Sequence, residues 1–184
     1  MTLAEQIAAL DKLIMFVENE LPKYVEQVAA SDLAALVANR VITTGEDSDG
    51  AKFSPYSTNK NRAAAYIGKS RNQAAERKIK ALQRAGTAIS YTTFRELNNL
   101  QTDFKRYEFT GEMWKKFGVT RSDLTQDSYK ITIGGTSTAA QEKIDANSAY
   151  ENQSIIEASE GERVTVQNTA SSWLEEQVKR ILIA

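Results

Sequence analysis

The chain has 184 residues and a net charge of −1, which is long enough for one domain with a hydrophobic core. It contains neither cysteine nor histidine, so disulfides, thiolate chemistry, histidine metal sites and histidine general bases are all excluded. No stretch approaches the roughly 18 to 20 apolar residues of a membrane span, and acids stand near the start where a signal peptide has bases. We expect a protein that is synthesised in a cytoplasm, needs no cofactor and does not bind a membrane.

The charges are distributed unevenly along the sequence. Residues 1–50 carry three basic and nine acidic side chains, whereas residues 51–84 carry nine basic and one acidic. The rest of the chain is mildly acidic. This separation predicts surfaces that meet a charged partner, either nucleic acid or the acidic face of a neighbouring subunit.

The first predicted element is a long amphipathic helix whose apolar residues are spaced by alternating steps of four and three. They are Leu3, Ile7, Leu10, Ile14, Val17, Leu21, Tyr24 and Val28. Pro22 lies within this pattern, so we expect a kink, or two helices that meet near Glu20–Pro22. The apolar face either packs on the chain's own domain or bridges to another subunit, and the spacing alone does not decide between them.

A second helix is predicted from about Ser31, with Ser31 or Asp32 as its N-cap and its end before Gly45. Its expected buried face holds Leu33, Leu36, Val37 and Val41. We therefore divide the chain into an N-terminal helical arm or helix pair, residues 1–40, and a single α+β domain, residues 41–184.

A basic insertion at about 57–86 interrupts that domain. Residues 57–71 are predicted to form a loop with one short helical piece. The segment Asn72–Arg84 is predicted to be helical, with Gly86 as its stop. Its expected inward residues are Ala75, Ile79 and Leu82.

The remaining segments predict a mixture of helices and strands. An extended piece leads into a short helix through Phe94, Leu97 and Leu100, and a second short helix opens at Thr110 and buries Met113, Trp114 and Phe117. Alternation over Tyr129–Ile133 indicates a strand, residues 137–150 a helix, and residues 153–158 either a second strand or an extended approach to the next helix.

The C-terminal helix starts with a capping box, in which Ser159 precedes Glu162 by three residues. Its expected buried face holds Val166, Ala170, Trp173, Leu174, Val178, Ile181 and Leu182. The predicted fold class is α+β, with N-terminal helices, a small antiparallel sheet and a long C-terminal amphipathic helix.

The acidic loop between Gly45 and Gly50 resembles an ion site only superficially. If Asp47 opened an EF-hand loop, Thr58 would stand where a bidentate glutamate must close it. We therefore expect a solvated turn with Glu46, Asp47 and Asp49 at the surface. The aromatic cluster after this loop, Phe53, Pro55 and Tyr56, is predicted to be a docking element with its rings packed.

The basic block is the strongest departure from ordinary composition. It comprises Lys60, Arg62, Lys69, Arg71, Arg77, Lys78, Lys80 and Arg84. These residues could neutralise DNA phosphates, pair with an acidic patch on a neighbouring subunit, or form a solvated helix face. The few nearby aromatic residues, Phe53, Tyr56 and Tyr66, give little support for base stacking.

Several short motifs, taken in order, are similar to those of one protein family. The first comprises Ile42, Gly45, Asp47, Gly50, Phe53, Pro55, Tyr56 and Ser57. Further matches are Tyr91 with Arg95, then Thr110, Gly111 and Met113, then the segment 154–162. The pattern resembles the bacteriophage virion-morphogenesis proteins, the tail-completion and head–tail joining proteins of the neck. The chain departs from that pattern at Ser154, where the family has arginine, and in its long basic linker.

The resemblance implies a structural virion protein, made in the bacterial host and copied around an axis into a ring in the neck or tail. Such a ring, on the order of six or twelve copies, joins portal or other connector and tail proteins and lets DNA pass; each copy then needs two complementary faces. Leu10, Ile14, Val17, Phe53, Pro55 and Tyr56 are the predicted docking residues. The alternative is a DNA-binding or packaging-associated protein that uses segment 52–84. No enzymatic activity is expected, because the usual base, nucleophile and metal-ligand sets are missing.

Overall fold

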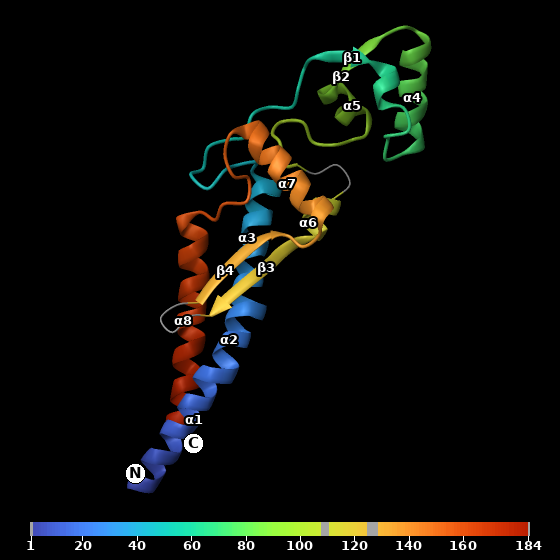
Figure 1. Cartoon of the computed structure of the whole chain (residues 1–184). Helices are drawn as coiled ribbons and strands as arrows, with labels where there is room; N and C mark the ends of the chain where they lie inside the picture. Colours follow the sequence, from blue (N-terminus) through green and yellow to red (C-terminus); the bar gives the residue numbers. More distant parts are fainter. Residues whose placement is uncertain (1, 108–110, 125–128, 184) are drawn as a thin grey trace.

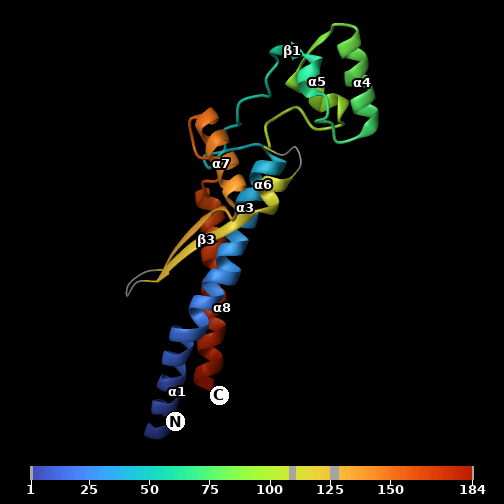
Figure 2. The same ribbon diagram turned by 45° about the vertical axis from the view of Figure 1, so that its right-hand side comes forward.

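The computed structural model describes residues 2–107, 111–124 and 129–183. The molecule is elongated, with a helical arm at one end, a small lobe at the other and a body between them (Figures 1 and 2). Both chain termini lie toward the free end of the arm. The elements are helices and two separate two-stranded antiparallel sheets, which confirms the α+β class.

A continuous helical run extends from Leu3 to Thr43. It comprises α1 (Leu3–Met15), a π-helical turn (Phe16–Glu20), α2 (Leu21–Tyr24), a second π-helical turn (Val25–Ala29) and α3 (Ala30–Thr43). We call the part before α3, residues 3–29, the arm. The predicted end of this run is confirmed, because Gly45 leaves the helix with a φ of 66°.

The kink or meeting of two helices predicted near Glu20–Pro22 corresponds to a junction in the structure, where the π-helical turn Phe16–Glu20 meets α2 at Leu21, and the chain stays helical through Pro22. The turn before this proline is π-helical, so the Leu21 N–H bonds to the Phe16 carbonyl five residues back. A wider turn changes the hydrogen-bond ladder where proline lacks a donor, which is how the helix accommodates it. The second helix predicted from about Ser31 is α3, which begins at Ala30, but the predicted caps Ser31 and Asp32 are wrong: the N-cap position is Ala29, and no side chain caps this end.

The C-terminal helix α8 (Glu160–Ile183) runs back along the arm and α3 (Figures 1 and 2). Its predicted capping box is confirmed: the Ser159 N–H donates to the Glu162 carboxylate at 2.7 Å, and the Glu162 N–H donates to the Ser159 hydroxyl at 3.2 Å. Its predicted face is half-buried, apart from Leu182, which is exposed.

The body contains a hairpin of β3 (Phe117–Leu124) and β4 (Tyr129–Gly135), with α6 (Glu112–Lys115) before it and α7 (Thr138–Glu151) after it. The predicted strand is β4 and the predicted helix 137–150 is α7. The expected burial of Phe117 in a helix is wrong, because Phe117 opens β3. Of the two alternatives for residues 153–158, the strand is absent: within this described segment there are only turns and irregular chain. The expected cap at Thr110 lies outside the described residues.

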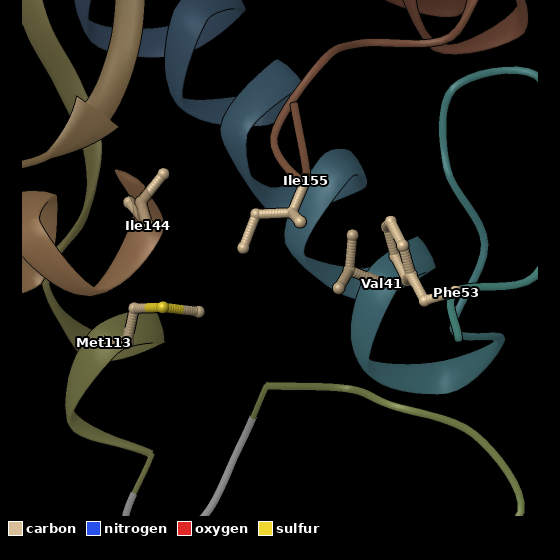
Figure 3. Close-up of a cluster of buried hydrophobic side chains, with 5 residues drawn as sticks. All are labelled: Val41, Phe53, Met113, Ile144 and Ile155. Carbon is tan, nitrogen blue, oxygen red and sulfur yellow. The ribbon is translucent and has the colours of Figure 1, made fainter. Parts of the chain in front are cut away.

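One hydrophobic core holds the body together. Its buried residues are Val41, Phe53, Met113, Ile144 and Ile155, which come from five different segments (Figure 3). Ile155 is buried here from an irregular segment rather than from a strand.

The lobe at the far end, which we call the cap, spans residues 60–98. It contains β1 (Lys60–Arg62), a 3-10 turn (Ala63–Tyr66), α4 (Gln73–Arg84), β2 (Ala88–Ser90) and α5 (Tyr91–Leu97). Its own buried cluster consists of Ala63, Tyr66, Ile79, Ile89 and Phe94. The predicted helix is α4, capped by the Asn72 side chain, whereas β1, which pairs with β2, was not predicted.

Candidate functional site

The free end of the arm carries an exposed apolar surface. The exposed fractions are 73% for Leu3, 52% for Ile7, 58% for Leu10, 54% for Ile14 and 52% for Val17. We call these five residues the arm stripe. All thirteen residues of α1 are described, and none of them is buried. The first of the two alternatives, packing on the chain's own domain, is therefore wrong for this part of the predicted face.

A different face of the arm contacts α8. The Trp173 ring stacks on the Tyr24 ring with centroids 3.7 Å apart and lies 5.6 Å from the Phe16 ring. Phe16 is buried and Leu13 half-buried on the same side. Residues at helix positions 13 and 16 lie about 100° from those at 10 and 14, so packing on α8 leaves the arm stripe uncovered.

The π-helical turn explains why the predicted apolar face changes environment along the arm. Leu3 to Val17 are exposed, but Leu21 and Tyr24, next in the same spacing, are half-buried. A π-helical turn holds about one more residue than an α-helical turn, so it rotates the helix after it by roughly 100° relative to the helix before it. That rotation turns Leu21 and Tyr24 toward α8, whereas Val28, the last residue of the predicted face, is 41% exposed.

The arm stripe has an acidic edge. Asp11 and Glu18 directly follow Leu10 and Val17 along the helix, and both acids are exposed. An apolar stripe of this length on an isolated chain is more than the scattered single residues found on monomer surfaces. The arm therefore offers an interaction surface that combines apolar contact with negative charge.

The aromatic residues that were predicted to dock on a partner, Phe53 and Tyr56, are buried in the single chain. Phe53 is 3% exposed and packs in the body core, and Tyr56 is 8% exposed. The Arg95 guanidinium lies 4.1 Å from the Tyr56 ring centre, and the Arg106 N–H donates to the Tyr56 hydroxyl. Burial raises the pKa of Tyr56. Of the three residues of the aromatic cluster, only Pro55 is exposed, so the two aromatic rings pack within the chain.

The prediction that Asp47 lies at the surface is wrong. Asp47 is buried, and its carboxylate accepts hydrogen bonds from the Asp49 N–H at 2.9 Å and the Ala51 N–H at 2.8 Å. Only Asp49 is fully exposed, as expected. Asp47 folds the loop on itself, because the short side chain can cap backbone donors two and four residues ahead.

Two chain segments connect the cap to the body, one before residue 60 and one after residue 98. A buried ion pair between Lys105 and Glu151, together with Ser54, links both segments to the end of α7. The Lys105 ammonium lies 2.8 Å from the Glu151 carboxylate and donates to the Ser54 hydroxyl at 2.8 Å, and the side chains of the pair are 8% and 5% exposed. The Ser54 N–H also donates to Glu151 at 3.0 Å. Burial opposes ionisation of Glu151, but the hydrogen bonds from Lys105 and Ser54 outweigh it, so its pKa is lowered.

Tyr107 lies against this pair, and its pKa is raised by burial and by the nearby Glu151 carboxylate. A cavity of about 300 Å³ adjoins the pair. Its lining consists of Tyr56, Ser57, Tyr91, Arg95, Lys105, Tyr107, Asn147 and Tyr150. Sequence reasoning missed this centre, because Lys105 and Glu151 are far apart in the chain and neither stands in a recognisable motif.

The eight basic residues of the sequence prediction all lie on the cap, and all are exposed. Lys60 and Arg62 are on β1 and the last four are on α4, of which Lys80 pairs with Glu76 at 3.4 Å. Tyr66 is buried and stacks on Phe94, so it cannot stack on a base. The basic surface therefore lies at the opposite end of the molecule from the acidic arm (Figure 1).

Other kinds of site are not found in the part of the chain that the structure describes. Within it, no three His, Cys, Asp or Glu side chains gather in a way that could hold a metal ion. Among the same residues, no helix has both the length and the apolar character needed to cross a bilayer. The chain matches no protein-family model, no curated protein and no solved structure.

Proposed function

We propose that this chain is a structural virion protein of a tailed bacteriophage, one subunit of a homo-oligomeric neck ring that joins portal or connector to tail. The observation that carries the proposal is the arm stripe, an apolar surface on the free end of a long helix. Burying such a surface against another chain is favourable by about 25 cal/mol per Å². The motif resemblance to virion-morphogenesis proteins supplies the setting.

The distribution of charge supports a repeated head-to-tail contact. A cyclic ring larger than a dimer requires two different faces on each copy, because the same operation must connect every neighbour. The arm is acidic and the cap basic, and the two lie at opposite ends of the molecule. Neither surface can neutralise the other within one copy, so each is available to a neighbour.

The first test measures self-association. The purified chain should give a mass above the monomer in light scattering, and Leu10→Glu with Ile14→Glu should return it to the monomer. The matched control is Ser171→Glu with Ser172→Glu, which changes two exposed residues of α8 and should keep the large mass. A wild-type chain that stays monomeric alone and with portal protein would refute the ring.

The second test concerns the virion. In the phage that encodes this protein, loss of the gene should leave heads and tails that are complete but unjoined in electron micrographs. The Leu10→Glu and Ile14→Glu double variant should produce the same particles, and the α8 control should restore joined ones. Joined, infectious particles without the gene would show that the protein has another role.

A second candidate function is DNA binding by the cap, which is favoured by the exposure of all eight basic residues on one lobe. Each phosphate contact adds about 0.9 to the slope of log affinity against log salt. Arg77→Gln, Lys78→Gln and Arg84→Gln together should therefore lower that slope by roughly 2 to 3 in a gel-shift titration. Lys115→Gln with Lys116→Gln in the body is the control. No duplex binding by the wild type at low salt would exclude this function.

A further inference from the structure

The arm has a second surface feature besides the arm stripe, a hollow whose lining is partly polar and partly apolar. This hollow of about 390 Å³ lies between α1 and the last turn of α8. Its lining consists of Glu5, Ala8, Ala9, Lys12, Ile181, Leu182 and Ile183. Ile183 is 85% exposed, so the floor of the hollow continues onto an open apolar surface.

The hollow and the arm stripe lie on opposite sides of α1. At about 100° per residue, Glu5, Ala9 and Lys12 lie about 140° to 180° from Ile7 and Ile14, whereas Ala8 lies about 100° to 120° from them. One copy therefore presents a convex row of large aliphatic side chains on one side and, on the other, a concave surface in which Ala8, Ala9 and the isoleucines of α8 lie beside Glu5 and Lys12. Two faces of this kind satisfy the geometric requirement for a head-to-tail contact, whereas a single self-complementary face would give a closed dimer.

The charges around the two faces are complementary. The arm stripe is edged by the acids Asp11 and Glu18, whereas the hollow includes Lys12. The hollow also contains an acid, Glu5, whose carboxylate accepts the Thr2 N–H in the α1 capping box, so among the lining residues the complementary charge comes from Lys12. Opposite charges at the rim of an apolar contact favour the correct register and disfavour a contact between two acidic-edged stripes.

We propose that the arm stripe of one copy packs into the hollow between α1 and α8 of the next copy. The arms then stand side by side, and each copy uses one face toward each neighbour. This inference rests on the proposed function and specifies the contact that would close the ring. The occupant of the arm stripe is thus a second copy of this chain and not another protein of the particle.

Because the natural chain has no cysteine, introduced cysteines report this contact without background. Leu10→Cys marks the arm stripe and Ile183→Cys marks the hollow, and both positions are exposed in one chain. After mild oxidation, the double variant should give a ladder of disulfide-linked oligomers. An equimolar mixture of the two single variants should give dimers and no higher species, and each single variant alone should stay uncrosslinked. Leu10→Cys combined with Ser171→Cys, on an exposed part of α8, is the control and should give no ladder.

The outcomes separate this inference from the proposed function. Dimers of Leu10→Cys alone would mean that stripe packs on stripe, which overturns the inference while the chain still self-associates. A large mass in light scattering without any Leu10–Ile183 link would overturn it in the same way. A folded chain that stays monomeric, even with portal protein, would overturn the inference and the ring proposal together.

A charge exchange gives an independent readout. Lys12→Glu should weaken self-association by roughly two- to five-fold, the size of effect expected for an exposed ion pair at an interface rim. Combining Lys12→Glu with Asp11→Lys and Glu18→Lys inverts the charge on both sides of the contact, so it should restore the wild-type dissociation constant within about twofold. If the triple variant instead associates more weakly than the Lys12→Glu variant alone, the proposed pairing of the two faces is wrong.

Discussion

At the residue scale, Asp47 holds together a loop whose acidic residues resemble an ion site, because it accepts hydrogen bonds from the backbone of that loop. Its carboxylate satisfies two backbone donors in a buried position. Asp47→Ala should therefore lower the free energy of unfolding by about 1 to 2 kcal/mol, since two part-buried backbone N–H groups lose their acceptor. The exposed neighbour provides the control, because Asp49→Ala should change stability by less than about 0.5 kcal/mol. Urea denaturation measures the stability of both variants. Equal losses for Asp47→Ala and Asp49→Ala would contradict the role of the Asp47 hydrogen bonds.

Phe53 should matter more than either acid. It fills the body core beside Val41, and truncating a buried phenylalanine leaves a cavity. Phe53→Ala should lower the free energy of unfolding by about 3 to 5 kcal/mol. The sequence alone predicts that replacing the aromatic residues of this loop harms folding or assembly more than replacing its acids. Because Asp47 is buried, the expected loss of stability for Asp47→Ala comes closer to that for Phe53→Ala but stays smaller. A Phe53→Ala chain as stable as Asp49→Ala in urea denaturation would refute the packing argument.

The Lys105–Glu151 pair makes stability depend on pH. The pKa of Glu151 is lowered in the folded chain, so its contribution is complete above the ordinary value of 4.5 and is lost as pH falls through the folded pKa. Breaking a buried pair typically costs about 3 kcal/mol, so Glu151→Gln should be less stable at pH 7 by that order. It should also lose less stability than the wild type when pH falls from about 5 to about 3.

The matched control for that prediction is the exposed pair of Lys179 and Glu175, whose side chains are each 71% exposed. Glu175→Gln should change stability at pH 7 by no more than about 0.5 kcal/mol. Thermal or urea unfolding across the pH range gives both measurements. Parallel pH profiles for the wild type and Glu151→Gln would mean that the buried pair does not control the acid dependence.

At the element scale, local signals predicted helices better than strands or partners. The helix α8 is indicated by the capping box of Ser159 and Glu162, and α4 by its stop at Gly86, because both signals lie within a few residues of the helix end. The strand β3 has no comparable signal. Its glycine and charged residues look like loop, and its structure depends on pairing with β4.

The candidate interaction surface was predicted in part, for the same reason. Heptad spacing correctly marks Leu10, Ile14 and Val17 as one helix face, but spacing carries no information about what covers a face. The π-helical turn that divides this face is a feature of hydrogen bonding along the whole arm. The buried pair of Lys105 and Glu151 lies beyond local reasoning altogether, since only tertiary folding brings the two residues together.

The π-helical turn predicts how the arm responds to deletion of one residue. Removing exposed Asn19 from the turn Phe16–Glu20 should let it close into an α-helical turn, with the faces on both sides kept in place. Removing exposed Asn39 from α3 should instead rotate the whole arm by roughly 100° relative to the body. We expect a small change in melting temperature for the first deletion and a large decrease for the second. Similar melting temperatures for the two deletions would mean that the π-helical turn does not determine which face of the arm packs on α8.

At the scale of the whole molecule, the free end of the arm contributes to assembly and little to folding. The buried residues of the two cores come from the body and the cap, and α1 adds none to either. A chain that starts at Met15 loses four of the five arm-stripe residues but keeps Phe16 and Tyr24 on Trp173. It should therefore melt cooperatively within a few degrees of the full chain, and light scattering should give the mass of a monomer.

A longer truncation supplies the contrast. A chain that starts at Ala30 loses Phe16 and Tyr24 as well and leaves Trp173 without its ring partners, so its tryptophan fluorescence should shift toward that of an exposed indole and its melting temperature should fall. The two truncations separate the arm's two faces, because one removes the surface offered to a neighbour and the other removes the surface used within the chain. If the chain that starts at Met15 also fails to fold, α1 is part of the fold itself, and the arm stripe can no longer be explained by assembly alone.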